Sequence, residues 1–363
     1  MKNVTIYDVA ERANVSPSTV SRVMGSSQHP VSEKIRERIL KAAEELDYIP
    51  NIQARALKTQ NNSSVGVIIP SIDNPFYPQL VRGMSDEAMD RGISIYLSNC
   101  DREYTLTDRQ IQTMLEQNVK GIVSVYIDRT TPSLERFVDR GGILVSLCGN
   151  NFAYNKAYNF QTDKVQESVI AVEYLLSLGH KKIAMMINEI NCQIREDKFR
   201  GYQMALEKNG IPFDDRYLYI YKGENEKNSN TVKHGDADRG ILLARQLMDR
   251  SPEVTAIVCM NDIMALGVCA ELRARNLRVP DDYSVMGFDD AFFSEYCYPS
   301  LTTVALEKYD WGKTIMKFMI DRLETTSQGL DDRDVPNNLL PPVHLIARES
   351  TGVPRANKTV IRP

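Results

Sequence analysis

Residues 5–48 show apolar positions at helical spacing, interrupted by short polar turns. Apolar residues recur three or four positions apart after Thr5 and again after Ser32, a spacing typical of amphipathic helices. Thr5 is a preferred capping residue with Asp8 three positions later, and Ser16 followed by Pro17 marks a second helix start. The pattern therefore predicts three short helices, the third beginning at Ser32.

The first two predicted helices are joined by a tight turn and share an apolar side. Its members are Ile6, Val9, Ala10, Val15, Val20 and Val23. The remaining positions of the second helix face outward, namely Pro17, Ser18, Ser21 and Arg22. This arrangement is helix-turn-helix geometry, with residues 17–22 as the recognition helix. A pair of generic surface helices has a similar pattern, so the segments that follow decide between the two interpretations.

Residues 50–58 contain good helix formers but are too few for a helix that is stable alone. Leu57 has little chain around it to cover it, so it is a candidate wedge for the DNA minor groove. Alternatively, Leu57 packs against its dimer mate. We therefore predict a helix-turn-helix DNA-binding domain at 1–49 and a hinge helix with a polar linker at 50–64.

From residue 65 the chain alternates short apolar runs with segments of helical length. This order predicts an α/β core of two lobes, each a doubly wound parallel sheet as in periplasmic binding proteins. The predicted strands are 65–69, 94–97, 121–125, 143–147, 182–187, 217–221, 256–259 and 284–288. Later elements recross between the lobes. The expected lobes are 65–160 plus 292–322 and 161–291 plus 323–350, followed by a tail at 351–363.

Polar residues gather after four of these strands. They are Asp73 with Phe76 and Tyr77, then Asp128, then Asn261 with Asp262, and finally Asp289 with Asp290. Ligands of such sheets bind beyond the carboxyl ends of the strands, so we expect these residues to converge on one cleft. Their acceptors and aromatic faces suit a polyhydroxylated ligand. Alternatively, Asn261 or Asp262 only caps the helix that begins near Met264.

Composition and charge agree with a DNA-binding protein that acts as a dimer. The chain has 363 residues, 42% of them hydrophobic, and its six cysteines are scattered as expected for reduced thiols. It shows no signal peptide and no apolar run near the ~20 residues that span a bilayer, so we expect a cytoplasmic location without a membrane partner. Residues 1–60 hold nine Lys or Arg against seven Asp or Glu. Such a weakly basic head should need a second copy to bind DNA well.

The sequence gives no support for an enzyme. It contains no dinucleotide-binding glycine pattern, no phosphate-binding loop, no zinc-protease motif and no nucleophile elbow. The four histidines lie far apart in the sequence, and none stands beside a plausible nucleophile. We therefore expect no catalysis, no cofactor and no metal.

The residues that carry these predictions resemble the lactose and galactose repressor (LacI/GalR) family of bacterial transcription regulators. The matching stretches are 4–10, 15–16, 19–23, 48–51, 54–57, 73–77, 179–180, 201–202, 261–262, 287–290 and 299–304. The resemblance implies that residues 17, 18 and 22 read bases in the major groove and that Leu57 inserts at the operator centre. The full set of expected DNA-contacting residues is Thr5, Tyr7, Ser16, Pro17, Ser18, Thr19, Ser21, Arg22, Asn51, Ala54 and Leu57.

The resemblance also implies an effector site. Phe76 and Tyr77 would line it, Asn261 and Asp289 would bind effector hydroxyls, and the remaining expected contacts are Asp73, Asp128 and Lys198. Lys198 stands where sugar-binding members commonly have Arg, and Lys cannot form the planar fork of a guanidinium. The effector could thus be a sugar or a sugar phosphate, and a phosphoprotein corepressor, as in the catabolite-control branch, stays open.

Together these features predict a homodimeric regulator, which we expect to be a repressor, that binds a palindromic double-stranded DNA operator. An effector that favours one arrangement of the lobes would change the affinity for DNA, which is allosteric control. Release by an inducer and strengthening by a corepressor both fit the sequence. An exported sugar-binding transport protein shares the two-lobed fold, but it would need an export signal and would have no use for residues 4–58.

Overall fold

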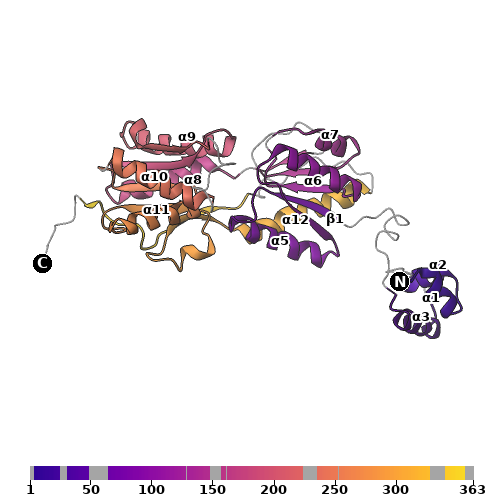
Figure 1. Cartoon of the computed structure of the whole chain (residues 1–363). Coiled ribbons are helices and arrows are strands. Elements are labelled where there is room, and N and C mark those ends of the chain that lie inside the picture. Colours follow the sequence, from indigo (N-terminus) through magenta and orange to yellow (C-terminus); the bar gives the residue numbers. More distant parts are fainter. Residues whose placement is uncertain are drawn as a thin grey trace. The chain divides into compact units, whose positions relative to one another are not determined.

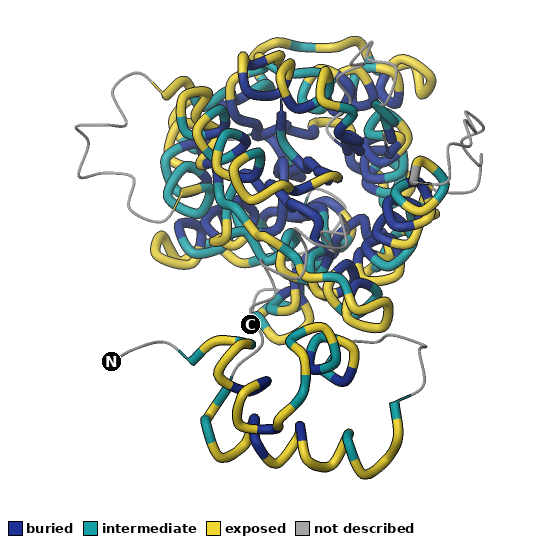
Figure 2. The backbone as a smooth tube through the Cα atoms, turned by 90° about the vertical axis from the view of Figure 1, so that its right-hand side faces the viewer, coloured by how far each residue is buried: buried dark blue, intermediate teal, exposed yellow. Residues whose placement is uncertain are grey.

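The computed structural model describes residues 4–24, 31–48, 64–127, 129–147, 157–160, 162–223, 235–251, 253–327 and 340–355. The chain divides into two compact units, Met1–Ser63 and Ser64–Pro363 (Figure 1). Buried residues concentrate in the interior of the second unit, whereas exposed residues lie mainly on its outer helices (Figure 2). No helix in the described ranges is long and apolar enough to cross a membrane.

The first unit contains the three predicted helices, α1 (Ile6–Arg12), α2 (Pro17–Met24) and α3 (Glu33–Glu45). The Asp8 carboxylate accepts hydrogen bonds from the Thr5 N–H at 2.7 Å and the Thr5 hydroxyl at 2.6 Å. The Ser16 hydroxyl accepts from the Thr19 N–H at 3.2 Å, which confirms the start of the second helix. The three helices pack around a small core of Val9, Ala10, Ala13, Val20, Val23, Ile39, Ala42 and Ala43.

The first lobe of the second unit is built on a parallel sheet in the order β2-β1-β3-β4-β5. Its strands are β1 (Ser64–Ile69), β2 (Ser94–Asn99), β3 (Gly121–Ser124), β4 (Ile143–Ser146) and β5 (Ala157–Asn159). Its helices are α5 (Phe76–Asp90), α6 (Tyr104–Glu116) and α7 (Pro132–Asp139). The doubly wound architecture is confirmed, whereas the sequence did not predict β5, which has only three residues.

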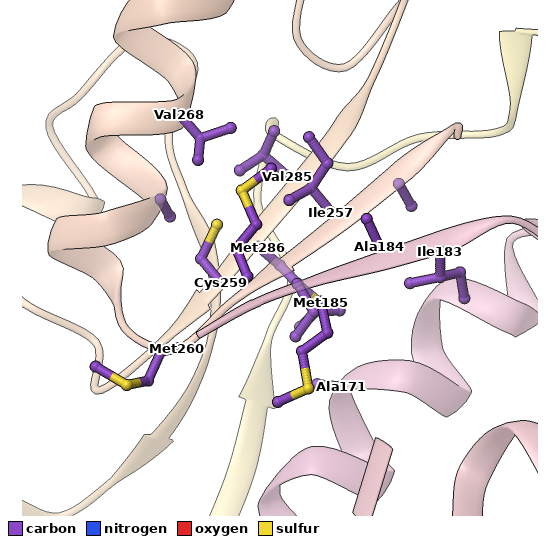
Figure 3. Close-up of a cluster of buried hydrophobic side chains, with 14 of the residues drawn as sticks. Ala171, Ile183, Ala184, Met185, Ile257, Cys259, Met260, Val268, Val285 and Met286 are labelled. Atoms are coloured by element: carbon purple, nitrogen blue, oxygen red, sulfur yellow. The ribbon is translucent and has the colours of Figure 1, made fainter. Parts of the chain in front are cut away.

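The second lobe has a six-stranded sheet in the order β11-β10-β9-β8-β6-β7, in which only β11 is antiparallel. The strands are β6 (Ile183–Asn188), β7 (Leu218–Tyr221), β8 (Ala256–Cys259), β9 (Ser284–Phe288), β10 (Thr302–Leu306) and β11 (Val343–Ile346). The helices are α8 (Lys164–Ser177), α9 (Gln193–Lys208), α10 (Asp236–Arg250) and α11 (Asp262–Ala274). Side chains of the central strands and flanking helices form its buried core (Figure 3).

The chain recrosses between the lobes at a different place from the one expected. β10 pairs with β9, so residues 302–306 belong to the second sheet and not to the first lobe. The next helix, α12 (Lys308–Ser327), then packs along α5 of the first lobe, so residues 323–327 lie in that lobe (Figure 1). Strand pairing and helix packing are contacts between distant residues, which local hydrophobic patterns do not report.

Candidate DNA-binding head and effector site

The recognition helix presents a polar outer side to solvent. Val20 and Val23 of α2 are buried in the head core, whereas Ser18 and Arg22 are exposed. The Arg22 side chain makes no hydrogen bond with any described residue, so its guanidinium is available to a ligand. Pro17, Thr19 and Ser21 are partly exposed, and Thr5, Tyr7 and Ser16 are exposed. Asn51, Ala54 and Leu57 lie outside the described residues.

Hydroxyl groups cluster at the amino-terminal end of α2. The Ser16 hydroxyl lies 2.7 Å from that of Ser18 and 2.8 Å from that of Thr19. Hydroxyls and free backbone N–H groups at a helix amino terminus are suited to bind phosphate oxygens, and the helix dipole favours the negative charge. The start of α2 therefore has the chemistry to contact the DNA backbone.

The start of α5 places the predicted aromatic pair of the first lobe. The Asn74 side chain accepts a hydrogen bond from the Phe76 N–H at 2.9 Å, and the Phe76 and Tyr77 rings meet edge to face at 5.2 Å. Burial raises the pKa of Tyr77 to about 12, and the carboxylates of Asp289 and Asp236 add to this rise. Both carboxylates belong to the second lobe, so the charges of that lobe act on Tyr77 of the first lobe.

Asp289 follows β9 with its backbone in the left-handed region, at a φ of 101°. This conformation is strained for a residue other than glycine and is common at functional sites. Burial raises the pKa of the Asp289 carboxyl, and the nearby cations Lys198 and Lys164 oppose the rise. The carboxylate makes no hydrogen bond or ion pair with any described residue. Asp289 therefore offers two acceptor oxygens to a ligand.

Lys198 lies in the interior, where its charge is already shared with protein groups. Its ammonium is 3.3 Å from a carboxylate oxygen of Glu167 and 3.3 Å from the centre of the Phe288 ring. The other oxygen of Glu167 binds Lys164 at 2.6 Å. Burial lowers the pKa of Lys198, although Glu167 opposes this effect. In this position Lys198 acts on Asp289 through its electric field and has no exposed face to offer a large ligand.

Asn261 caps α11, as the alternative interpretation of the sequence allowed. Its side-chain oxygen accepts from the Met264 N–H at 2.9 Å, and its amide nitrogen donates to Asp236 at 2.6 Å. Asp262 is buried, and its carboxylate accepts hydrogen bonds from the Ala291 N–H and from two hydroxyls. Both residues therefore hold the second lobe together. Asp73 is exposed on the turn before α5, and Asp128 lies outside the described residues.

The structure adds five residues to the site that were not among the expected contacts: Arg102, Tyr126, Asn188, Arg195 and Asp236. Asp236 accepts hydrogen bonds from Asn188 at 2.9 Å, from Arg239 at 2.8 Å and from Asn261 at 2.6 Å. Burial would raise the pKa of Asp236, but these donors lower it. The other amide atom of Asn188, its buried oxygen, has no hydrogen-bond partner among the described residues.

Two of these residues, Asn188 and Arg102, also lie at or after the carboxyl end of a strand, as the predicted site residues do. Asn188 ends β6, and Arg102 follows shortly after the end of β2. Like the predicted site residues, both stand at or beyond the carboxyl ends of parallel strands, which is the sequence signal that points to them. Among the described residues, no group of three or more His, Cys, Asp or Glu side chains could hold a metal ion.

Exposed apolar side chains also occur on the second lobe, on α11 and on residues 292–298. We call four of them the aromatic surface, namely Leu266, Phe292, Tyr296 and Tyr298. Tyr298 is 86% exposed, which is unusual for so large a ring. Next to it is a cavity of about 190 Å³ lined by Leu266, Cys269, Ala270, Arg273, Cys297, Tyr298, Pro299 and Leu301. Such a surface is typical of a protein interface.

Comparison with known proteins agrees with both units. Residues 5–51 match the family model of bacterial regulatory proteins of the lacI family, and residues 172–351 match that of a periplasmic binding protein-like domain. The chain is 34% identical over 322 residues to the catabolite control protein A of Priestia megaterium, covering 87% of this chain and 92% of that protein. It is 28% identical over 350 residues to the transcriptional repressor CytR of Escherichia coli K12, covering 96% of each.

Solved structures show the same likeness. The lac repressor dimer bound to operator and the anti-inducer ONPF superposes with a TM-score of 0.79 at 28% identity, covering 97% of this chain and all of that chain. The transcriptional regulator CelR in complex with cellobiose superposes with a TM-score of 0.67 at 26% identity, covering 96% of this chain and all of that chain. The two-lobed core with a helix-turn-helix head is therefore an architecture of DNA-binding regulators.

Proposed function

Because the chain belongs to the LacI family of bacterial transcriptional regulators, we propose which of its residues contact DNA, bind the effector and join two subunits. Family membership makes the protein a DNA-binding regulator that recognises an operator as a dimer and responds to a small-molecule effector; it is not an enzyme. The regulators it matches include repressors. The division of roles among residues is our proposal.

For the DNA-binding head, we propose that α2 enters the major groove. The guanidinium of Arg22 lies on the exposed side of this helix and makes no hydrogen bond with a described residue, and a guanidinium can bind the two acceptors of a guanine. The hydroxyls of Ser16 and Thr19 would contact phosphates and fix the position of the helix, whereas exposed Ser18 would face the bases with Arg22. This arrangement separates base recognition by Arg22 from backbone contacts at the start of the helix.

For the effector, we propose a site at the boundary of the two lobes. The proposal is supported by the aromatic pair Phe76 and Tyr77 at the start of α5 and by Asp289, which follows β9 with a left-handed backbone and whose charge acts on Tyr77. Two acceptors of the second lobe have no hydrogen-bond partner among the described residues, the Asp289 carboxylate and the buried oxygen of Asn188. Leaving a buried polar atom unpaired costs about 1–3 kcal/mol, which a donor on a ligand would recover. A hydroxyl-rich molecule such as a sugar or sugar phosphate supplies those donors.

Because the proposed site includes residues of both lobes, a bound ligand can change how the lobes are arranged. A ligand that binds Tyr77 and Asp289 together favours the arrangement of lobes in which both residues reach it. A change in that arrangement alters operator affinity only if the two states differ in DNA binding, as the effector response of the family requires. The same geometry serves an inducer or a corepressor, so the direction of the response is left to experiment.

The effector proposal is tested with the full-length protein. A thermal-shift screen of neutral sugars, sugar phosphates and nucleosides identifies a ligand, which is then added to an operator titration. We expect Asp289→Asn to abolish the effect of the ligand on operator affinity while basal DNA binding stays within about twofold, since the head is untouched. The matched control is Asp249→Asn, an exposed carboxylate of α10 in the same lobe. A normal dose response in Asp289→Asn would place the effector elsewhere.

For the dimer, we propose that the aromatic surface of the second lobe joins two copies of the chain. Exposed Tyr and Phe side chains beside a cavity are the typical anchors of protein interfaces. Regulators of this family bind DNA as dimers, and the aromatic surface is our candidate for the contact between the two copies. Leu266 lies on α11 and the aromatic residues on 292–298, so both segments would contact the partner.

A further inference from the structure

Resting on the effector contact proposed for Asp289, we infer that Lys308 is a positioning residue that couples the turn at 289–290 to the first turn of α12. Lys308 is the first residue of that helix, and its side chain is buried. Its ammonium donates hydrogen bonds to the carbonyl oxygens of Asp289 and Asp290, the second at 3.2 Å. A movement of the turn therefore acts directly on the start of α12.

The turn at 289–290 depends on contacts from other elements. Asp289 and Asp290 both have left-handed backbones, with φ of 101° and 46°, and such conformations persist only where the surroundings hold them. The Asp289 N–H donates to the Val304 carbonyl at 2.9 Å, and the Asp290 N–H donates to the Thr303 hydroxyl at 3.2 Å. Arg348 donates to the Asp290 carboxylate at 2.7 Å. These three contacts hold the turn within the second lobe, whereas the contact with Lys308 leads from the turn into α12.

A lysine at the first position of α12 is not explained by the stability of the helix. A cation at this end of a helix opposes the helix dipole, and burial of an ammonium group has a further cost. Lys308 makes no ion pair with any described residue. The two backbone carbonyls of the turn are the acceptors that compensate for its burial. The side chain therefore serves the turn and not the helix in which it stands.

The same turn of α12 is anchored in the first lobe by Trp311. This residue follows Lys308 by three positions, is 4% exposed and belongs to the same buried core as side chains of β1, β3 and β4. Beyond it, α12 packs along α5, the helix that begins with Phe76 and Tyr77 of the proposed effector site. One helical turn thus connects the Asp289 turn of the second lobe with the core of the first.

This connection separates ligand binding from the response to the ligand. A ligand that holds the Asp289 carboxylate also fixes the turn, and Lys308 passes the position of the turn to α12 and α5. Loss of the ammonium group leaves the carboxylate in place for the ligand but cuts the link to α12. Lys308 therefore acts on the operator response through the turn and without a contact of its own with the effector.

The first test needs no ligand, because Trp311 is the single tryptophan of the chain and reports on the start of α12. Acrylamide quenching of its fluorescence is measured in the full-length protein. We expect the quenching constant to rise at least twofold in Lys308→Met, which keeps the length of the side chain but has no donor, and to stay near the wild type in Lys308→Arg. The matched control is Lys317→Met, an exposed lysine of the same helix. An unchanged constant in Lys308→Met overturns the inference.

A double-mutant cycle shows whether the turn acts through Lys308. Asp289→Gly frees the turn from its strain, so it should raise the quenching constant of Trp311 in the wild type and have less than half of that effect in Lys308→Met. Equal effects in the two backgrounds would mean that the turn and α12 are independent. Circular dichroism shows whether each variant is folded, and Lys308→Gln replaces Lys308→Met in both measurements if the latter does not fold.

The second test measures the operator response. Ribose, cellobiose and glucose 6-phosphate are the probes, with binding followed by calorimetry and operator affinity by fluorescence anisotropy. For a sugar that binds the wild type, Lys308→Met should keep its affinity within about threefold, whereas the change in operator affinity at saturating sugar should shrink at least fivefold. Arg348→Gln, which loosens the turn on its other side, should bind the sugar more weakly but keep the full response at saturation.

A full operator response in Lys308→Met at saturating sugar would overturn the inference. If a sugar still changes operator affinity in Asp289→Asn, the proposed effector contact fails, and the quenching cycle still decides whether Lys308 couples the turn to α12. If none of the three sugars binds, the same cycle decides alone, since independent effects of Asp289→Gly and Lys308→Met exclude the coupling.

Discussion

Arg22 takes no part in the core of the head, so a substitution there tests DNA recognition without disturbing folding. Its neighbours Val20 and Val23 are buried, but its own guanidinium is exposed and has no hydrogen bond with any described residue. We expect Arg22→Ala to weaken operator binding by about 1–3 kcal/mol, since a bidentate contact with guanine is lost. Fluorescence anisotropy at fixed salt measures this. Arg38→Ala, an exposed residue of α3, is the control; equal affinities for the wild type and Arg22→Ala would contradict the assignment.

Asp262 is a buried carboxyl without a cationic partner among the described residues. Burial raises its pKa to about 7, and Asp289 adds to the rise. Since the pKa in the folded protein exceeds the ordinary value of 3.8, protonation favours the folded state. The stabilising contribution is complete below the ordinary pKa and is lost as pH rises to about 7.

We therefore expect the pH dependence of unfolding to change in Asp262→Asn, which carries no charge at any pH. The free energy of unfolding of the wild type minus that of the variant should fall between pH 4 and 7, by at most about 1.4 kcal/mol per pH unit. Urea denaturation at four or more pH values measures the difference. Parallel curves for the two proteins would show that Asp262 does not titrate in this range.

At the scale of elements, the contact between α5 and α12 ties the late part of the chain to the first lobe. Glycines allow this close approach: a Cβ at Gly312 would lie 2.1 Å from the Leu80 carbonyl oxygen, and one at Gly83 would lie 2.0 Å from that of Tyr309. Both neighbours are backbone atoms, which cannot turn away as a side chain can. The two helices therefore need glycine at their contact.

Gly312→Ala should destabilise the protein by about 1–3 kcal/mol, because the added methyl group forces the helices apart. This outweighs the higher helix propensity of Ala. The midpoint of urea denaturation measures the loss. Ser85→Ala, at an exposed position of α5, is the control and should stay close to the wild type. Equal stability of Gly312→Ala and the wild type would mean that the helices can separate at little cost.

At the scale of the whole molecule, regulation requires two chains. Two weakly basic heads must act together to bind one operator tightly, so the subunit contact contributes directly to DNA affinity. The aromatic surface, which we propose for this contact, lies on the second lobe, whereas the head belongs to a different unit. Disruption of the surface should therefore weaken DNA binding without any change in the head.

We expect the double variant Leu266→Glu with Tyr298→Arg to sediment as a monomer at micromolar concentration and to lose at least tenfold in operator affinity. Charged side chains cannot be buried in an apolar contact without a partner. Met204→Arg, an exposed apolar position on α9, should remain dimeric. Analytical ultracentrifugation decides the question, and a stable dimer of the double variant would move the interface to another surface.

The sequence by itself determined the parts of this protein that depend on neighbouring residues. Capping at Thr5 and Ser16, the apolar sides of the head helices and the alternation of strands and helices are local features, and the structure confirms them. The same patterns predicted a two-lobed α/β core behind a helix-turn-helix head. Pairing of β10 with the second sheet was not predicted, because short apolar runs carry no information about their partners.

Only the tertiary structure decided which polar side chains remain available. Asn261 and Asp289 both follow buried strands, yet Asn261 is occupied as a cap and the Asp289 carboxylate has no partner among the described residues. Lys198 forms an ion pair with Glu167, whereas Arg102, which the sequence did not single out, makes no hydrogen bond with a described residue. Residue type sets what a side chain can bind, but burial and competing partners from distant segments set whether it is free to do so.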